Sequence, residues 1–177
     1  MLKRIGRFFR HLCSNPWQVK RHFSAHALQN IEAAITASEK KHTGEIRFVV
    51  EAGLHPYEIV CKKSPRARGI ELFGRLNIWD TENNNGVLIY LLLADRDVEI
   101  VADRSIDKHI GYDGWDLMCH EMEVMFRRGE FEAGVLQGIE KVNAALEQHF
   151  PIASVKNKRK RAVQRKKNEL PDKPLIL

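Results

Sequence analysis

The stretch NNNGVLIYLLLADRDVEIVA, residues 83–102, decides the fold of this chain. Its apolar run, 86–94, has no polar face, which predicts a strand covered on both sides of a sheet. The sequence DRD at 95–97 is typical of a tight turn, and the run 98–102 then reads as a second strand. We therefore expect a β-hairpin in which Ala94 lies near Val98.

A third strand and a helix precede this hairpin. The segment EIRFVVE, residues 45–51, is rich in β-branched and aromatic side chains and predicts a strand. Ser64 and Pro65 are typical of a helix start, and the helix continues to Leu76. A strand, a crossover helix and a strand imply a parallel pair with a right-handed connection. The hairpin then adds an antiparallel strand at one edge.

Further helices surround this sheet in the sequence. Helical spacing of apolar residues predicts them after Ser24, from Trp115 to Phe126 and from Phe131 to Leu146. The predicted order is α-β-α-β-β-α-α. It favours an α/β fold, a three-layer α/β/α sandwich with a small mixed sheet, which consists of a parallel pair and an antiparallel edge hairpin.

Charge divides the chain into three parts. Residues 1–21 carry six Lys or Arg and no acid, and residues 156–177 carry nine against two acids. The remaining middle holds 14 basic and 21 acidic residues, although the whole chain has a net charge of +6. We therefore predict a basic amphipathic segment at 1–21, one α/β domain at 22–152 and a basic tail at 153–177.

Cysteine usage and hydropathy indicate a compartment. Three scattered cysteines without CxxC spacing form neither a disulfide framework nor a zinc site. No apolar stretch reaches the roughly 18 residues of a membrane span. The basic N-terminus lacks the apolar run of a signal peptide. We expect a cytoplasmic protein, with a peripheral position at the inner membrane face as the variant that the basic ends suggest.

The basic ends suggest partners. Leu2, Ile5, Phe8, Phe9 and Leu12 form an apolar stripe on a basic helix. We expect this stripe to dock on the domain, and a membrane interface is the alternative. An anionic membrane surface or an acidic protein would suit both basic ends. Nucleic acid is a further candidate, but the tail has no interleaved aromatic residues for base stacking. The sequence does not indicate an oligomeric state.

Several of these segments together resemble the TPM domain family. The family unites a thylakoid phosphatase-like protein, a photosystem II repair protein and a receptor-associated protein, and this chain resembles a small cytoplasmic stand-alone member of bacterial type. The resemblance covers about 24–150 and is carried by the strand Glu45–Glu51, the helix Ala67–Leu76, the run Asn84–Ile89 with Asp95-Arg96 and Val98–Val101, and the stretch Phe126–Ile139. It implies acid phosphatase activity in one branch and calcium binding in some members.

Polar residues at the strand ends form two candidate cation sites. Strand directions place one group at the start of the apolar strand: Glu45, Asn84, Asn85, Asp103 and Asp107. The alternative group lies at the opposite end and consists of Glu51, Asp95 and Asp97. Both offer the oxygen ligands that Ca²⁺ or Mg²⁺ prefers. Ordinary turn chemistry explains several of these residues equally well.

Three hypotheses for function follow. The first is a TPM-type interaction module, with cation binding in its acidic body and basic ends on a membrane or an acidic partner. The second is a metal-dependent phosphatase, in which a bound cation polarises a phosphoryl oxygen. The third is a nucleic-acid-associated protein acting through its tail. No complete catalytic set is visible in the sequence, so whether the chain is an enzyme stays open.

Overall fold

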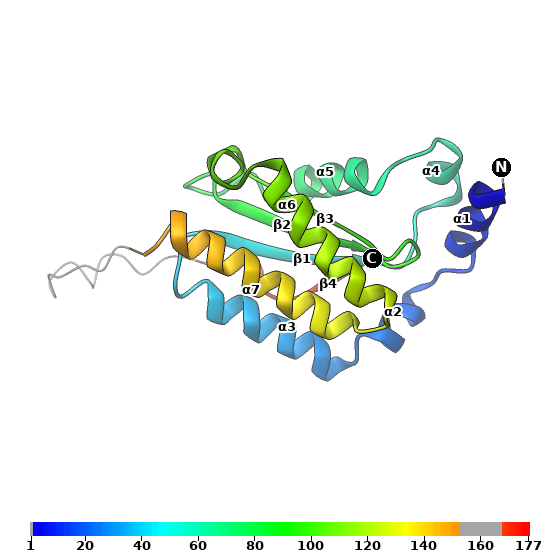
Figure 1. The fold of residues 1–177 in the computed structure, drawn as a ribbon, viewed down its shortest axis with the longest axis horizontal. Helices are drawn as coiled ribbons and strands as arrows, with labels where there is room; N and C mark the ends of the chain where they lie inside the picture. Colours follow the sequence, from blue (N-terminus) through cyan, green and yellow to red (C-terminus); the bar gives the residue numbers. More distant parts are fainter. Residues whose placement is uncertain (1, 153–167) are drawn as a thin grey trace, which may run out of the picture.

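The computed structural model describes residues 2–152 and 168–177 and forms a three-layer α/β/α sandwich (Figure 1). Helix α5 (Pro65–Arg75) covers one face of the central sheet. Helices α3 (Ala25–Ser38), α6 (Arg104–Arg127) and α7 (Phe131–His149) cover the other. The predicted fold class is therefore confirmed.

The sheet has four strands in the order β3-β2-β1-β4. The parallel pair β1 (Glu45–Glu51) and β2 (Gly86–Leu92) forms its centre. Strand β3 (Asp97–Ala102) returns antiparallel to β2, as expected. Every residue of β2 is buried, because helices cover both of its faces.

Strand β4 (Leu175–Ile176) is absent from the sequence prediction. It pairs in parallel with Val49 and Val50 of β1. The Arg47 guanidinium donates to the backbone oxygens of Pro171 and Lys173 and so fastens the segment before this strand. The last ten residues therefore pack on the domain, although they follow a strongly charged run. Residues 153–167, the rest of the predicted basic tail, lie outside the described residues.

The hairpin register differs from the prediction. Val98 pairs with Leu91 rather than lying near Ala94, because the chain turns at residues 93–96 and Asp97 already belongs to β3. Arg96 takes a left-handed conformation in this turn, with φ of 54°. Asp103 nevertheless lies at the predicted end of β2, where its backbone N–H donates to Gly86 O at 2.9 Å.

Two helices in the first third are also additional. Helix α2 (Pro16–His22) is capped by the Asn15 side chain and buries Val19 in the main core. Helix α4 (Pro56–Val60) lies between the predicted strand 45–51 and the predicted helix that starts at Ser64, and His55 and Glu58 form a capping box at its start. These helices are five and seven residues long, too short for a visible helical period.

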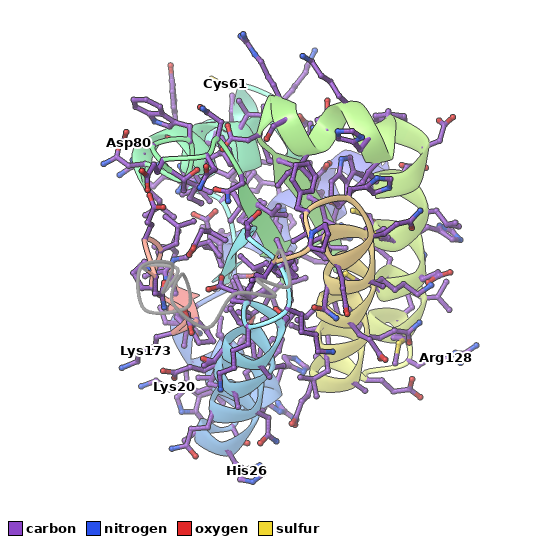
Figure 2. All side chains as sticks on the ribbon, turned by 90° about the vertical axis from the view of Figure 1, so that its left-hand side faces the viewer. Lys20, His26, Cys61, Asp80, Arg128 and Lys173 are labelled. Carbon is purple, nitrogen blue, oxygen red and sulfur yellow. The ribbon has the colours of Figure 1, made fainter. Side chains whose placement is uncertain are left out.

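Helix α1 (Leu2–Leu12) docks by its basic side instead of its apolar stripe. Arg7, Arg10 and His11 share one helical face and converge on Asp95. Phe9 and Leu12 are consequently exposed, and the predicted docking of the whole stripe is wrong for these two side chains. The Asp95 carboxylate, in the turn between β2 and β3, therefore determines which side of α1 faces the domain. Figure 2 shows other charged side chains, such as Lys20 and Arg128, projecting from the surface.

Candidate functional site

The residues of the first predicted cation site lie near the amino end of β2, where several of their side chains form hydrogen bonds with backbone atoms. Asp103 Oδ2 accepts the Gly86 N–H at 3.0 Å, and the Ser105 hydroxyl donates to Asn84 O. Asn85 is buried, and its amide donates to Thr43 O. These polar groups satisfy backbone atoms where two strands and α6 meet. Their contacts are those of a turn and a helix start.

The two remaining members of this group point to different partners. Glu45 is fully buried, and its Oε2 accepts the N–H groups of Glu169 and Leu170 at 3.3 Å each. Asp107 instead accepts the indole N–H of Trp115 at 3.1 Å. The five residues are therefore neighbours in the fold, but their carboxylates do not converge.

The alternative group at the other end of the sheet begins with a buried carboxylate. Glu51 receives two hydrogen bonds from Arg68, at 2.7 and 3.0 Å, and one from the Tyr90 hydroxyl at 2.6 Å. This hydrogen bonding, with the charges of Glu51, Glu58 and Glu71, outweighs burial and raises the pKa of Arg68. Burial, followed by the charge of Glu51, raises the pKa of Tyr90. Glu51 thus belongs to a structural charge pair.

Asp95 has cationic partners of its own. Arg7 Nε lies 2.8 Å from its Oδ2, and Arg10 Nη2 lies 3.2 Å from its Oδ1. His11 Nδ1 accepts the Leu54 N–H at 2.9 Å, which leaves Nε2 to face Asp95 Oδ2 at 3.1 Å. Burial alone would raise the pKa of Asp95, but the hydrogen bonds from His11 and Arg7 outweigh burial and lower the pKa to about 2.

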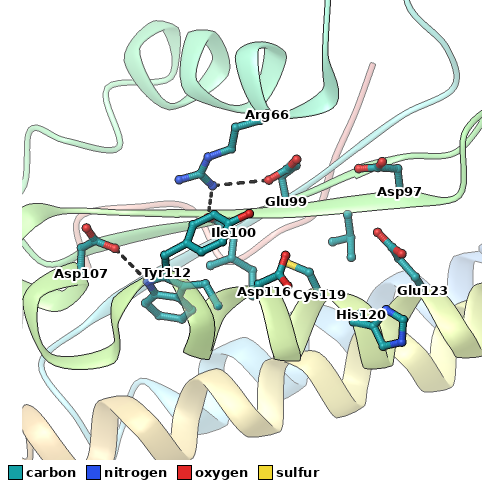
Figure 3. Close-up of a pocket in the computed structure, with 12 residues that line it drawn as sticks. Arg66, Asp97, Glu99, Ile100, Asp107, Tyr112, Asp116, Cys119, His120 and Glu123 are labelled. Atoms are coloured by element: carbon teal, nitrogen blue, oxygen red, sulfur yellow. Dashed lines mark hydrogen bonds and ion pairs between the residues drawn. The ribbon is translucent and has the colours of Figure 1, made fainter.

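Asp97 lies in one row with Glu51 across the sheet, with Leu92 between them. Two strand spacings separate the two residues, about 10 Å. The Asp97 side chain faces a separate groove of about 390 Å³ along the edge strand β3, between α5 and α6 (Figure 3). The structure therefore does not assemble Glu51, Asp95 and Asp97 into one site.

Acidic side chains from β3 and α6 line this groove: Asp97, Glu99, Asp107, Asp116 and Glu123. Burial, then the charges of Glu123, Glu99 and Asp95, raises the pKa of Asp97 to about 7. Arg66 approaches Glu99 at 3.5 Å and donates to Ile100 O on the open edge of the strand. Cys119 is buried beside Ile100, and burial raises the pKa of the Cys119 thiol to about 12.

A site for Ca²⁺ or Mg²⁺ requires several oxygen ligands around one point. Within residues 2–152 and 168–177, no group of three His, Cys, Asp or Glu side chains is placed to hold a metal ion. Most predicted ligands instead accept hydrogen bonds from the chain itself, as described above. Divalent cation binding gains no support from this geometry and stays a prediction.

A second feature lies at the N-terminal helices. The exposed large apolar side chains in this region are Phe9, Leu12 and Trp17 from α1 and α2, with Tyr57 and Val60 from α4, which packs against α1. Trp17 is 69% exposed and Phe9 57%. We call these five residues the N-terminal apolar face. Basic residues of α1 and α2, namely Arg10, Lys20 and Arg21, are exposed in the same two helices.

Comparison with known proteins identifies the domain. A family model described as the TPM domain matches residues 20–145. The chain belongs to the TPM domain family. Helix α1 and strand β4 lie outside the matched residues. No curated protein matches the chain.

Solved structures agree with this assignment. The chain is similar to the BA42 protein from the psychrophilic bacterium Bizionia argentinensis, with a TM-score of 0.70 and 28% identity over 88% of this chain and 95% of that one. It shares its fold with the N-terminal domain of a protein from P. gingivalis, with a TM-score of 0.59 and 18% identity over 72% of this chain and 78% of that one.

Sequence reasoning missed the groove and the basic docking of α1. The groove draws its acids from β3 and α6, which follow one another in the chain, but their side chains line one groove only because α6 packs back on β3. One signal was available for α1: Arg7, Arg10 and His11 have the spacing of a single helical face.

Proposed function

We propose that this TPM domain is an interaction module that binds an anionic membrane surface through its N-terminal apolar face. One observation carries the proposal: α1 turns its basic side toward Asp95 and leaves Phe9 and Leu12 exposed. Exposed aromatic residues in helices that also carry exposed basic residues are typical of surfaces that enter the interface of a bilayer.

The charges near this face support an anionic partner. Residues 1–21 carry six Lys or Arg and no acid. Each basic residue near an anionic leaflet contributes about 1 kcal/mol of attraction. Exposed aromatic rings add affinity, because their apolar bodies and polar edges suit the headgroup region. Among the described residues no helix has the length and hydropathy needed to cross a bilayer, so binding would occur at the surface.

Vesicle sedimentation tests this proposal. The full chain is mixed with vesicles of phosphatidylcholine alone or with about one third phosphatidylserine, near physiological ionic strength, where charges still act over about 8 Å. We expect binding to the anionic vesicles only. Trp17→Ala removes the most exposed aromatic residue of α1 and α2 and should weaken binding about three- to tenfold, since one interfacial anchor is lost.

A matched control variant distinguishes specific binding through the N-terminal apolar face from nonspecific binding through any exposed aromatic residue. Trp79 is also exposed, at 52%, and lies in the connection between α5 and β2, near the amino end of β2. Trp79→Ala should bind anionic vesicles like the wild type. Equal losses for both variants, or equal binding to neutral and anionic vesicles, would overturn the proposal.

The structure gives less support to the phosphatase hypothesis and to the nucleic-acid hypothesis. The phosphatase reading needs a bound cation or a free nucleophile, and the described carboxylates that were its candidates mostly accept internal hydrogen bonds. Binding of nucleic acid through 153–167 falls on residues outside those described. Both stay predictions.

A further inference from the structure

A basic pocket lies beside the N-terminal apolar face. It has a volume of about 480 Å³ and is formed by the end of α1, by α2 and by the β2–β3 turn. Arg10, Arg21, His22 and Arg96 line it, together with Ser14 and Gln18. None of the described residues that line it is acidic. Three different elements thus bring cationic groups around one hollow.

Two of these cations are not neutralised by the chain. Neither Arg21 nor Arg96 forms an ion pair within residues 2–152 and 168–177, and the Arg96 guanidinium makes a long hydrogen bond, 3.4 Å, to Arg127 O. Arg10 shares Asp95 with Arg7 and His11, so one carboxylate faces three basic groups. The lining of the pocket therefore has an excess of positive charge and no acidic side chain.

His22 lines the pocket, and the positive charge of the neighbouring arginines affects its pKa. His22 packs on Phe131 with ring centroids 4.3 Å apart. Burial, then the charges of Arg21 and Arg96, lowers the pKa of His22. Positive charge thus disfavours a further proton on this ring, which is the condition under which a bound anion would be stabilised.

We propose that this pocket binds the phosphate group of a phosphomonoester. Guanidinium groups donate paired hydrogen bonds to phosphate oxygens, and a dianion matches two unpaired arginines better than a carboxylate or a phosphodiester does. A lipid headgroup and a soluble ester offer the same group. The lipid source rests on the proposed membrane function, because it requires the N-terminal apolar face to lie on a bilayer.

One backbone feature makes a clean variant available. Arg96 has a φ of 54°, a conformation that Asn adopts at lower cost than Arg. Arg96→Asn should therefore keep or raise stability while it removes one charge. Arg21 is exposed in the last turn of α2, where Gln is well tolerated. The double variant Arg21→Gln/Arg96→Asn empties the pocket of its unpaired charges and leaves the contacts of Asp95 intact.

The first arm of the test uses inorganic phosphate and NMR of the full chain. Phosphate is titrated at constant ionic strength against chloride, and the ring signals of His22 are followed across pH. We expect saturable shifts and a rise of the His22 pKa when phosphate is bound. The double variant should bind phosphate at least about tenfold more weakly, since each charged hydrogen bond to phosphate is a strong one.

A charge-matched control accompanies it. Lys20→Gln/Arg128→Gln also removes two exposed positive charges, and neither residue lines the pocket (Figure 2). This control should change phosphate affinity less than twofold. If the phosphate titration does not saturate, or if both double variants weaken phosphate binding equally, the proposed phosphate site is wrong. This conclusion does not depend on the vesicle experiments.

The second arm identifies the source of the phosphate. Vesicles with phosphatidic acid are compared with phosphatidylserine vesicles of equal surface charge. Preference for phosphatidic acid that the pocket variant loses would assign the headgroup as the ligand. Saturable phosphate binding without any vesicle binding would leave the pocket standing for a soluble ester and would overturn the proposed membrane function alone.

Discussion

Asp95 and Asp97 are two residues apart and have opposite environments. Asp95 faces Arg7, Arg10 and His11. Asp97 instead lies beside Glu99 on β3 and opposite Glu123 of α6 (Figure 3). One carboxylate is therefore held ionised, and the other retains its proton up to about pH 7. This difference leads to two predictions with opposite signs.

The first concerns Asp97. Its pKa is raised from 3.8 to about 7 in the folded protein, so unfolding between these pH values releases a proton and the free energy of unfolding falls as pH rises. Asp97→Asn should flatten this dependence. Because the site is partly solvated, we expect the variant to be about 1–2 kcal/mol more stable than the wild type at pH 8 and nearly equal at about pH 3, where the carboxyl is protonated in both the folded and the unfolded state.

Urea unfolding at both pH values measures this effect. Asp80→Asn, at an exposed acid in the connection before β2, is the matched control and should show no such contrast. An Asp97→Asn variant without added stability at pH 8 would contradict the crowding of acids in the groove.

The second prediction concerns Asp95. Its pKa is lowered from 3.8 to about 2, so its contribution to stability is present above pH 4 and is lost as pH falls through the folded pKa. At pH 7, Asp95→Asn removes the charge that Arg7, Arg10 and His11 share. The α1 dock should weaken by about 1–2 kcal/mol after screening.

Hydrogen exchange of the α1 amides reports this loss directly. Exchange in residues 2–12 should accelerate by about tenfold, while exchange in β2 stays unchanged. Asp97→Asn is the control and should leave α1 protected. Unchanged protection of α1 in Asp95→Asn would show that other contacts hold the helix.

At the level of elements, sequence pattern predicted the parts whose signals are local. Strands β1, β2 and β3 have continuous apolar or β-branched runs, and the glycine that begins β2 is required because a Cβ at Gly86 would lie 2.1 Å from Ile78 O. The predicted helix begins at Trp115, whereas α6 begins at Arg104 and continues through a kink at Gly111. Local patterns thus fixed the sheet better than they fixed helix ends.

The elements that pattern did not predict depend on distant contacts. Strand β4 has two residues and follows prolines, so its pairing with β1 is visible only in the fold. The orientation of α1 depends on Asp95, more than 80 residues away. Predicted ligands such as Glu51 found internal partners, because Arg68 and Tyr90 reach it from α5 and β2.

The C-terminal segment provides a prediction at this scale. Leu170 is buried against the α5 side of the sheet. Leu170→Ala should lower the free energy of unfolding by about 2–4 kcal/mol, through lost burial and the cavity that remains. Leu177→Ala, at a side chain that is 37% exposed, should cost less than about 1 kcal/mol. Equal small effects in urea unfolding would show that the segment does not contribute to the fold.

The whole molecule combines a basic N-terminal end with an acidic body. Residues 22–155 hold 14 basic and 21 acidic residues, and the first 21 hold only basic ones. An anionic surface therefore attracts residues 1–21 and repels residues 22–155, which orients the molecule before contact. This orientation is electrostatic, and salt weakens it.

We therefore expect a salt dependence that sequence alone could not assign to one face. Affinity for phosphatidylserine vesicles should fall at least about fivefold between 0.05 and 0.5 M salt, since screening shortens the range of these charges. The residual affinity at high salt should still fall further in Trp17→Ala, because the aromatic contribution is apolar. Salt-independent binding would contradict an electrostatic approach.

The pairing of β1 with β4 also has a consequence for biosynthesis. Val49 of β1 pairs with Leu175 of β4, which is translated 126 residues later. At about 5–20 residues per second, the ribosome needs about 6–25 seconds to make that stretch. During this time the outer edge of β1 presents unpaired backbone groups, the feature that promotes aggregation of incomplete sheets. A nascent chain of this protein is thus exposed at its centre until its last strand emerges, and it is in this interval that we expect chaperones to engage it.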